Sequence, residues 1–147
     1  VQLRGKDNHS LYCLAMYRSC PEKVSHGHLL STWNQQYHAL QQEYLDRQET
    51  PPPIDPREVC LQDLHRWIDT HIKTAKDRLV ILTDANQDLD TDTKELSLKN
   101  FTETHGLSST YTTLHGDTYL PSTKRGSKMI DHILTKHISS HLIRRNG

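Results

Sequence analysis

The sequence has few aromatic residues and no long apolar run. Of its 147 residues, 33% are hydrophobic and 6% are aromatic, and the mean hydropathy is −0.77. These values lie below the usual apolar share of a globular protein, so we expect one domain, residues 1–147, with a small core. No stretch approaches the roughly 20 apolar residues of a membrane-spanning helix. We therefore expect no membrane partner.

Cysteine is also scarce, and the three cysteines are odd in number. Cys13, Cys20 and Cys60 form no C-x-x-C pair, which argues against a disulfide framework and against a zinc ribbon. A reducing compartment, nuclear or cytoplasmic, is therefore expected. The chain begins with Val1, and no basic segment precedes an apolar run, so we expect no signal peptide. We interpret the chain as a domain cut from a longer polypeptide.

Neither sign of charge is in excess, since 18 Lys and Arg residues balance 18 Asp and Glu residues. The charges are nevertheless unevenly placed, because the segment after Pro121 is basic and residues 84–95 are acidic. An acidic and a basic segment in one domain suit a metal site beside a phosphate-bearing substrate. Two ordinary solvated loops would have the same composition, so both interpretations stay open.

The apolar residues that are present recur at strand or helix spacing. Short apolar runs predict strands over residues 10–17, within residues 78–89 and over residues 128–135. Helical spacing predicts helices over residues 29–48, 55–74 and 93–104.

Local signals mark the ends of two of these helices. Asp55, Pro56 and Glu58 are typical of a helix start, and Gly106 is typical of a helix end. The Thr- and Tyr-rich stretch around Tyr111 predicts short strands or extended loop. The order strand–helix–helix–strand–helix–strand indicates the α/β class.

The strand within residues 78–89 ends in a polar tip. Asp84 and Asn86 lie two residues apart, so on a strand both side chains point to the same face. A solvated turn after a buried strand would look the same. Asp131 favours the functional interpretation, because its apolar neighbours predict a buried carboxylate, which needs a cation, a histidine or a metal partner. These oxygen ligands suit a hard cation such as Mg²⁺.

Three short motifs resemble those of the endonuclease/exonuclease/phosphatase superfamily. Residues 82–86 (L-T-D-A-N) resemble its G-D-F/A-N motif, and residues 125–134 (R-G-S-K-M-I-D-H-I-L) resemble its R-G-x-x-x-I-D-x-I-L motif. Residues 16–20 (M-Y-R-S-C) match a Y-R-P-C variant. Together with residues 32–36 and 55–57, this variant is similar to the endonuclease-like domains of eukaryotic retroelements. The similarity covers residues 10–138.

The resemblance implies metal-assisted hydrolysis of a DNA phosphodiester, with Mg²⁺ or Mn²⁺ as cofactor. Asp84 would activate or position the attacking water and is a possible metal ligand, and Asn86 would orient that water and stabilise the transition state. Tyr17 would reach the scissile phosphate, and Asp131 would orient a catalytic histidine. The substrate-binding residues would be Arg18, Arg125 and Lys128.

Other parts of the family pattern have no counterpart in this sequence. The early Asn and the metal-binding Glu lie upstream in the family, and the closing S-D-H motif lies downstream. We therefore expect a partial α/β sandwich in which one half-sheet is largely missing, with an exposed apolar face or open strand edge. A non-catalytic remnant or nucleic-acid-binding module is the alternative, and the remainder of the parent polypeptide is an expected partner.

A third hypothesis concerns the acidic stretch itself. Asp84, Asn86, Asp88, Asp90, Asp92 and Glu95 fall at ligand positions of an EF-hand calcium loop. However, Leu89 occupies the position where the sharp turn requires Gly, and the segment before Asp84 prefers strand to helix. The 11 histidines show no zinc-finger spacing, so we expect most of them at the surface.

Overall fold

The computed structural model describes residues 1–20, 30–89, 97–116 and 129–139. Its described elements are a mixed five-stranded sheet and four α-helices, which confirms the α/β class. The strands are β1 (Gln2–Arg4), β2 (Ser10–Tyr17), β3 (Asp77–Asp84), β4 (Ser108–Ser109) and β5 (Asp131–Lys136). The helices are α1 (Thr32–Asp46), α2 (Pro56–His71), α3 (Leu98–His105) and α4 (Thr110–His115), and a 3-10 turn covers Lys6–Asn8.

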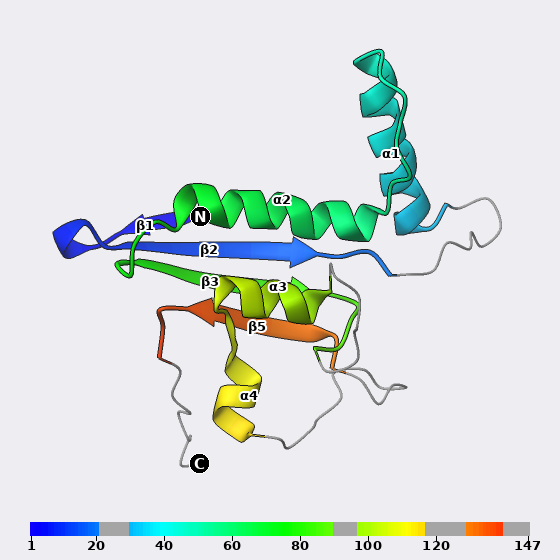
Figure 1. Cartoon of the computed structure of the whole chain (residues 1–147). Helices are drawn as coiled ribbons and strands as arrows, with labels where there is room; N and C mark the ends of the chain where they lie inside the picture. Colours follow the sequence, from blue (N-terminus) through cyan, green and yellow to red (C-terminus); the bar gives the residue numbers. More distant parts are fainter. Residues whose placement is uncertain (21–29, 90–96, 117–128, 140–147) are drawn as a thin grey trace.

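The sheet has the order β1-β2-β3-β5-β4 (Figure 1). β2 and β3 are parallel, and the other three pairs are antiparallel. β3 lies at the centre, where Leu79 and Ile81 are fully buried and Leu82 between Ile81 and Thr83 is half exposed. This alternation follows from the two-residue period of a strand and shows that only one face of the sheet is well covered.

Helices α2 and α3 cover that face and enclose the core. Leu61 and Ile68 of α2 and Leu98 of α3 are almost completely buried against Leu79 and Ile81. α1 projects away from the sheet and contacts α2 (Figure 1). The Trp33 indole of α1 is buried and donates to Asp55 Oδ1 at 3.2 Å, which fixes the base of α1 to the start of α2.

The helix ends follow the local chemistry of the sequence. The Asp55 carboxylate accepts from Arg57 N at 2.9 Å, and Pro56 occupies the first turn, as predicted. Ser97 accepts from Asn100 N at 3.0 Å and begins α3, whose expected start at residue 93 lies outside the described residues. Gly106 ends α3 in the left-handed conformation, with φ 59°.

Two expectations about local structure are wrong. The stretch around Tyr111 was expected to be extended, but Ser109 caps a short helix there by accepting from Thr112 N at 3.4 Å. Asp131 was expected to be buried in mid-strand, but β5 begins at this residue and its side chain is exposed. Its apolar neighbours Met129 and Leu134 are buried, so the carboxylate itself lies at the rim of the core.

Candidate functional site

Three predicted catalytic residues lie in one row across the sheet. Tyr17 at the end of β2 is the Cα partner of Asp84 at the end of β3, and Asp84 is the partner of Asp131 at the start of β5. Directly opposed residues point to the same face of a sheet, so these three side chains share one face and one end. We call Tyr17, Asp84 and Asp131 the strand-end row.

The strand-end row lies on the face opposite α2 and α3, which we call the open face. Tyr17, Leu82 and Ile133 on this face are 49%, 50% and 46% exposed. Within the described part of the chain, a groove of about 580 Å³ runs between the open face and α4. Its lining includes Asp84 and Asp131, together with Tyr111 and His115, whose rings lie 4.7 Å apart. The exposed apolar side chains agree with the expectation of an apolar face.

Asn86 does not share the strand face of Asp84, contrary to the two-residue argument. β3 ends at Asp84, and Asn86 has a φ of 47°, so the alternation of the strand stops before it. Its side-chain amide donates to the Arg18 carbonyl at 2.8 Å, and its backbone N–H donates to Asp84 Oδ1 at 3.3 Å. Asn86 therefore holds the ends of β2 and β3 together beside the strand-end row.

Arg18 and Arg57 form a buried connection beneath this end of the sheet. Arg18 is 4% exposed, and its Nε donates to the Arg57 carbonyl at 3.1 Å. Arg57 is 8% exposed and donates to the carbonyl of Ser19 and, at 3.4 Å, to that of Asn86. The substrate-binding role of Arg18 stays a prediction, and the structure shows that its side chain joins β2 to α2.

Several predicted residues lie outside the described residues. These are Arg125, Lys128 and the later part of the proposed calcium loop, namely Asp90, Asp92 and Glu95. Of that loop, Asp84 ends a strand where an EF-hand would have a helix, and Asp88 is 5% exposed. His132 lies on the opposite face from Asp131, where its Nε2 donates to the Gln87 carbonyl at 2.9 Å.

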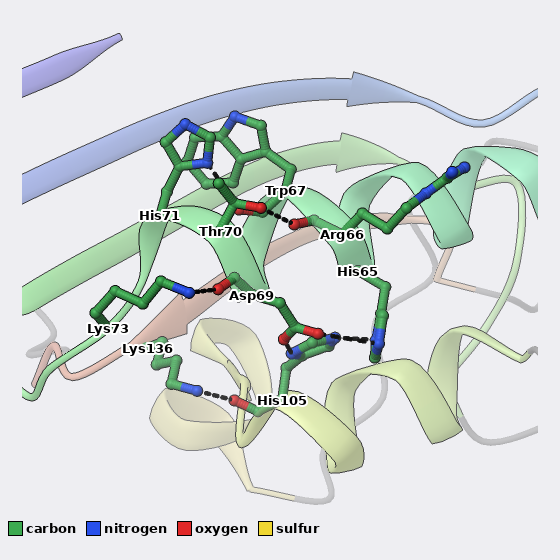
Figure 2. Close-up of polar contacts among 9 residues, drawn as sticks. All are labelled: His65, Arg66, Trp67, Asp69, Thr70, His71, Lys73, His105 and Lys136. Atoms are coloured by element: carbon green, nitrogen blue, oxygen red, sulfur yellow. Dashed lines mark hydrogen bonds and ion pairs between the residues drawn. The ribbon is translucent and has the colours of Figure 1, made fainter.

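A second cluster was missed by the sequence-based predictions. Among the described residues, His65, Asp69 and His105 are the one group of three whose ligand atoms could hold a metal ion, and these atoms lie within 4.8 Å of one another. His65 and Asp69 are four residues apart on α2, and His105 is the last residue of α3 (Figure 2). We call these three residues the His–Asp–His cluster.

An ion pair and a hydrogen bond connect the three side chains of the cluster through His65. His65 Nε2 lies 3.2 Å from Asp69 Oδ2, and His65 Nδ1 lies 2.8 Å from His105 Nε2. Burial lowers the pKa of His105, and the nearby His65 and Lys136 lower it further while Asp69 opposes them. The lowered pKa favours the neutral imidazole of His105, and Lys136 donates to the His105 backbone carbonyl at 2.6 Å.

One signal in the sequence points to half of this cluster. His65 and Asp69 have the four-residue spacing that places two side chains on one face of a helix. The third member, His105, is 36 residues further along, counted from Asp69 to His105, and no local pattern relates it to the pair. The packing of α3 on α2 brings it there.

Comparisons of the chain with protein-family models, with curated proteins and with solved structures found no match. In the described part of the chain, no helix is both long enough and apolar enough to cross a membrane.

Proposed function

We propose that this chain is part of a metal-dependent DNA endonuclease domain of the endonuclease/exonuclease/phosphatase type found in retroelements. The observation that carries the proposal is the strand-end row. Tyr17, Asp84 and Asp131 come from three motifs far apart in the sequence, and Asp84 is the direct cross-strand partner of both Tyr17 and Asp131. If the three short motifs matched the family by chance, their key residues would not be expected to align across one sheet.

The strand-end row suits a hard divalent cation. Asp84 and Asp131 are directly opposed carboxylates, and Tyr17 adds a phenolic oxygen, so the side chains of the row offer oxygen ligands only. Mg²⁺ commonly takes one or two carboxylates and fills its other positions with water and substrate phosphate. Asp84 would hold Mg²⁺ or Mn²⁺, which would supply positive charge to the phosphate, and Asp131 beside it would orient the catalytic histidine.

The substrate would lie along the open face. The groove beside the strand-end row is about 580 Å³, within the range of small-ligand pockets, and can accept a nucleotide next to the scissile phosphate. Tyr111 and His115 line its α4 side and present rings on which a base can stack. In this arrangement Asp84 positions the attacking water, Tyr17 contacts the phosphate, and Asn86 keeps the two strand ends in place.

The rest of the parent polypeptide would complete the site. Leu82 and Ile133 are about half exposed on the open face, and a second layer packed there would bury them. The same layer would supply the family's metal-binding Glu and its closing Ser-Asp-His. A nuclear or cytoplasmic location is part of the proposal, because the sequence has few cysteines and no C-x-x-C pair.

A plasmid-nicking assay with Mg²⁺ tests this proposal. Because the metal-binding Glu and the closing Ser-Asp-His would come from the rest of the parent polypeptide, we expect the chain alone to nick supercoiled plasmid slowly, and only when Mg²⁺ or Mn²⁺ is present. Asp84→Asn removes the group that positions the water, so the nicking rate should fall about 10²–10⁴-fold, the usual contribution of a general acid or base. Asp46→Asn, at the exposed end of α1 and far from the strand-end row in sequence, is the matched control and should keep the wild-type rate.

A gel-shift assay on the same proteins distinguishes the endonuclease from the alternative, a non-catalytic nucleic-acid-binding module. DNA binding that is equal in wild type and Asp84→Asn, with no nicking by either, would contradict catalysis by this chain and favour a non-catalytic binding module. Absence of both nicking and DNA binding would overturn the proposal as a whole.

A further inference from the structure

The His–Asp–His cluster is separate from the strand-end row and lies on the helix-covered side of the molecule. Figure 2 shows the Asp69 carboxylate beside the rings of both His65 and His105. Asp69 Oδ2 lies 3.2 Å from His65 Nε2, and Asp69 Oδ1 lies 3.9 Å from His105 Nδ1. The two rings are 4.7 Å apart at their centroids and meet edge to face.

We propose that His65, Asp69 and His105 bind one ion of the zinc class and thereby join the C-terminal turns of α2 and α3. Two imidazole nitrogens and one carboxylate oxygen are a ligand set typical of Zn²⁺ and of similar divalent transition metals. Mg²⁺ and Ca²⁺ prefer oxygen ligands, so this site and the strand-end row select different metals.

The distances already approach those of a metal centre. Bonds of about 2.0–2.1 Å in a tetrahedral site place neighbouring ligand atoms roughly 3.3 Å apart. Asp69 Oδ2 lies 3.2 Å from His65 Nε2, Asp69 Oδ1 lies 3.9 Å from His105 Nδ1, and one ligand atom from each residue lies within 4.8 Å of the other two, so small rotations of exposed side chains reach this separation. His105 is held in the core with its side chain 5% exposed, whereas the side chains of His65 and Asp69 are 48% and 60% exposed and can adjust to the ion.

The backbone around the cluster favours a cation. α2 ends at His71, two residues after Asp69, and α3 ends at His105 itself. The C-terminal ends of both helices therefore bring partial negative charge to the same place. Lys136 and Lys73 act against this, because their ammonium groups donate to the backbone carbonyls of His105 and Asp69. We therefore expect a site of moderate affinity that exchanges its ion with solvent.

Binding of an ion would also stabilise the fold. The cluster spans the contact between α2 and α3, and an ion held by ligands from both helices stabilises the folded chain and has no such site in the unfolded chain. Without metal, the His65–Asp69 ion pair and the His65–His105 hydrogen bond account for the same arrangement of side chains. The two explanations make different predictions. If the cluster is a metal site, Zn²⁺ raises the Tm, and variants of the three ligands lose this rise. If only the metal-free contacts hold the cluster, Zn²⁺ does not change the Tm.

Isothermal calorimetry with Zn²⁺, and visible absorption with Co²⁺ as a spectroscopic substitute, test the proposal on the full chain. We expect one Zn²⁺ per chain at this site, a visible Co²⁺ spectrum of low coordination number, and a rise in Tm with Zn²⁺. Replacement of groups that merely support metal ligands costs 10–100-fold in affinity, so loss of a ligand in His65→Ala or Asp69→Asn should weaken binding at least about ten-fold. Both side chains are largely exposed, so these variants are expected to fold.

His38→Ala is the matched control, because His38 is an exposed histidine on α1 outside the cluster. This variant should bind Zn²⁺ with wild-type affinity, and excess Mg²⁺ should not displace the ion from any protein that binds it. Equal Zn²⁺ affinity in wild type, His65→Ala and Asp69→Asn would overturn the proposal, because the metal would then bind elsewhere. Absence of any Zn²⁺ effect on wild type would overturn it as well.

Discussion

The two faces of the sheet differ in what covers them and in the chemistry that they carry. On the helix-covered face, Leu79, Ile81 and Leu134 are completely buried beneath α2 and α3. On the open face, Leu82 and Ile133 are about half exposed, although they are the direct neighbours of these residues in the sequence. One face therefore supplies the core of the described fold, and the other is available to a ligand or to another layer.

The two candidate sites follow this division. The strand-end row offers oxygen ligands on the open face, whereas the His–Asp–His cluster offers nitrogen and oxygen ligands among the helices. A strand end needs no packing partner for its side chain and can present reactive groups to solvent. A cluster between two helices can instead stabilise their packing. This difference is the reason why we propose chemistry at the first site and a structural ion at the second.

The largest expected effect is a loss of stability on truncating Ile81, in comparison with its neighbour Leu82 on the other face of β3. Ile81→Ala removes a side chain that is 0% exposed and should lower the free energy of unfolding by about 2–5 kcal/mol. Leu82→Ala changes a side chain that is 50% exposed, and its cost should stay below about 1 kcal/mol. Urea denaturation followed by circular dichroism measures both. Similar losses in the two variants would show that the open face is covered in solution.

A smaller effect is expected where the helix layer is joined to the strand ends. Arg57→Met removes the donors to the carbonyls of Ser19 and Asn86, and we expect a loss of about 2–3 kcal/mol, since hydrogen bonds to charged groups contribute about 1.5–3 kcal/mol. Arg66→Met is the control on the same helix, because Arg66 is exposed and pairs only with exposed Asp63 among the described ion pairs. Its cost should be within about 0.5 kcal/mol of zero. Equal losses would contradict the role of the buried connection.

The smallest expected effect is a pH-dependent change in stability at Asp77, at the end of β3 away from the strand-end row. Asp77 is the first residue of β3, and Asp84 is the last. The Thr74 backbone N–H donates to the Asp77 carboxylate at 2.9 Å and holds the pKa of Asp77 below its usual value. A lowered pKa in the folded state stabilises the fold above the ordinary Asp pKa of about 3.9, and this stabilisation is lost as the pH falls through the folded-state pKa.

Asp77→Asn should therefore be less stable than wild type at neutral pH, by less than about 1 kcal/mol because solvent screens this exposed carboxylate. The difference should shrink in acid, once the pH is below the folded-state pKa of Asp77. Thermal unfolding at a series of pH values measures it. A difference that grows as the pH falls would contradict the direction of the shift.

Much of the fold is predictable because its signals are local. The predicted strand over residues 10–17 coincides with β2, and Asp55, Pro56 and Gly106 mark helix ends as expected. The start of α4 was missed because Ser109 caps a helix in a stretch whose Thr and Tyr residues favour strands. Local preference is weak in such a short segment, and contacts of α4 with β4 and β5 outweigh it.

The candidate sites were predictable only in part. Asp84 and Asp131 were identified from their motifs, but the burial expected of Asp131 was wrong because its position at the start of β5 leaves the carboxylate exposed. Asn86 was expected on the strand but lies beyond it, because β3 ends at Asp84 and Asn86 has a positive φ. Strand ends are set by pairing with other strands, which a pattern within one segment does not contain.

By itself, the sequence determined the α/β class, the helix ends at Asp55 and Gly106 and the identity of the residues of the strand-end row, because periodicity, capping and short motifs act within a few residues. Only the tertiary structure decided that Tyr17, Asp84 and Asp131 stand side by side, and that His105 meets His65 and Asp69. Register and helix packing depend on contacts between residues far apart in the chain. Those contacts depend on the packing of several strands and helices together, and no single segment determines them.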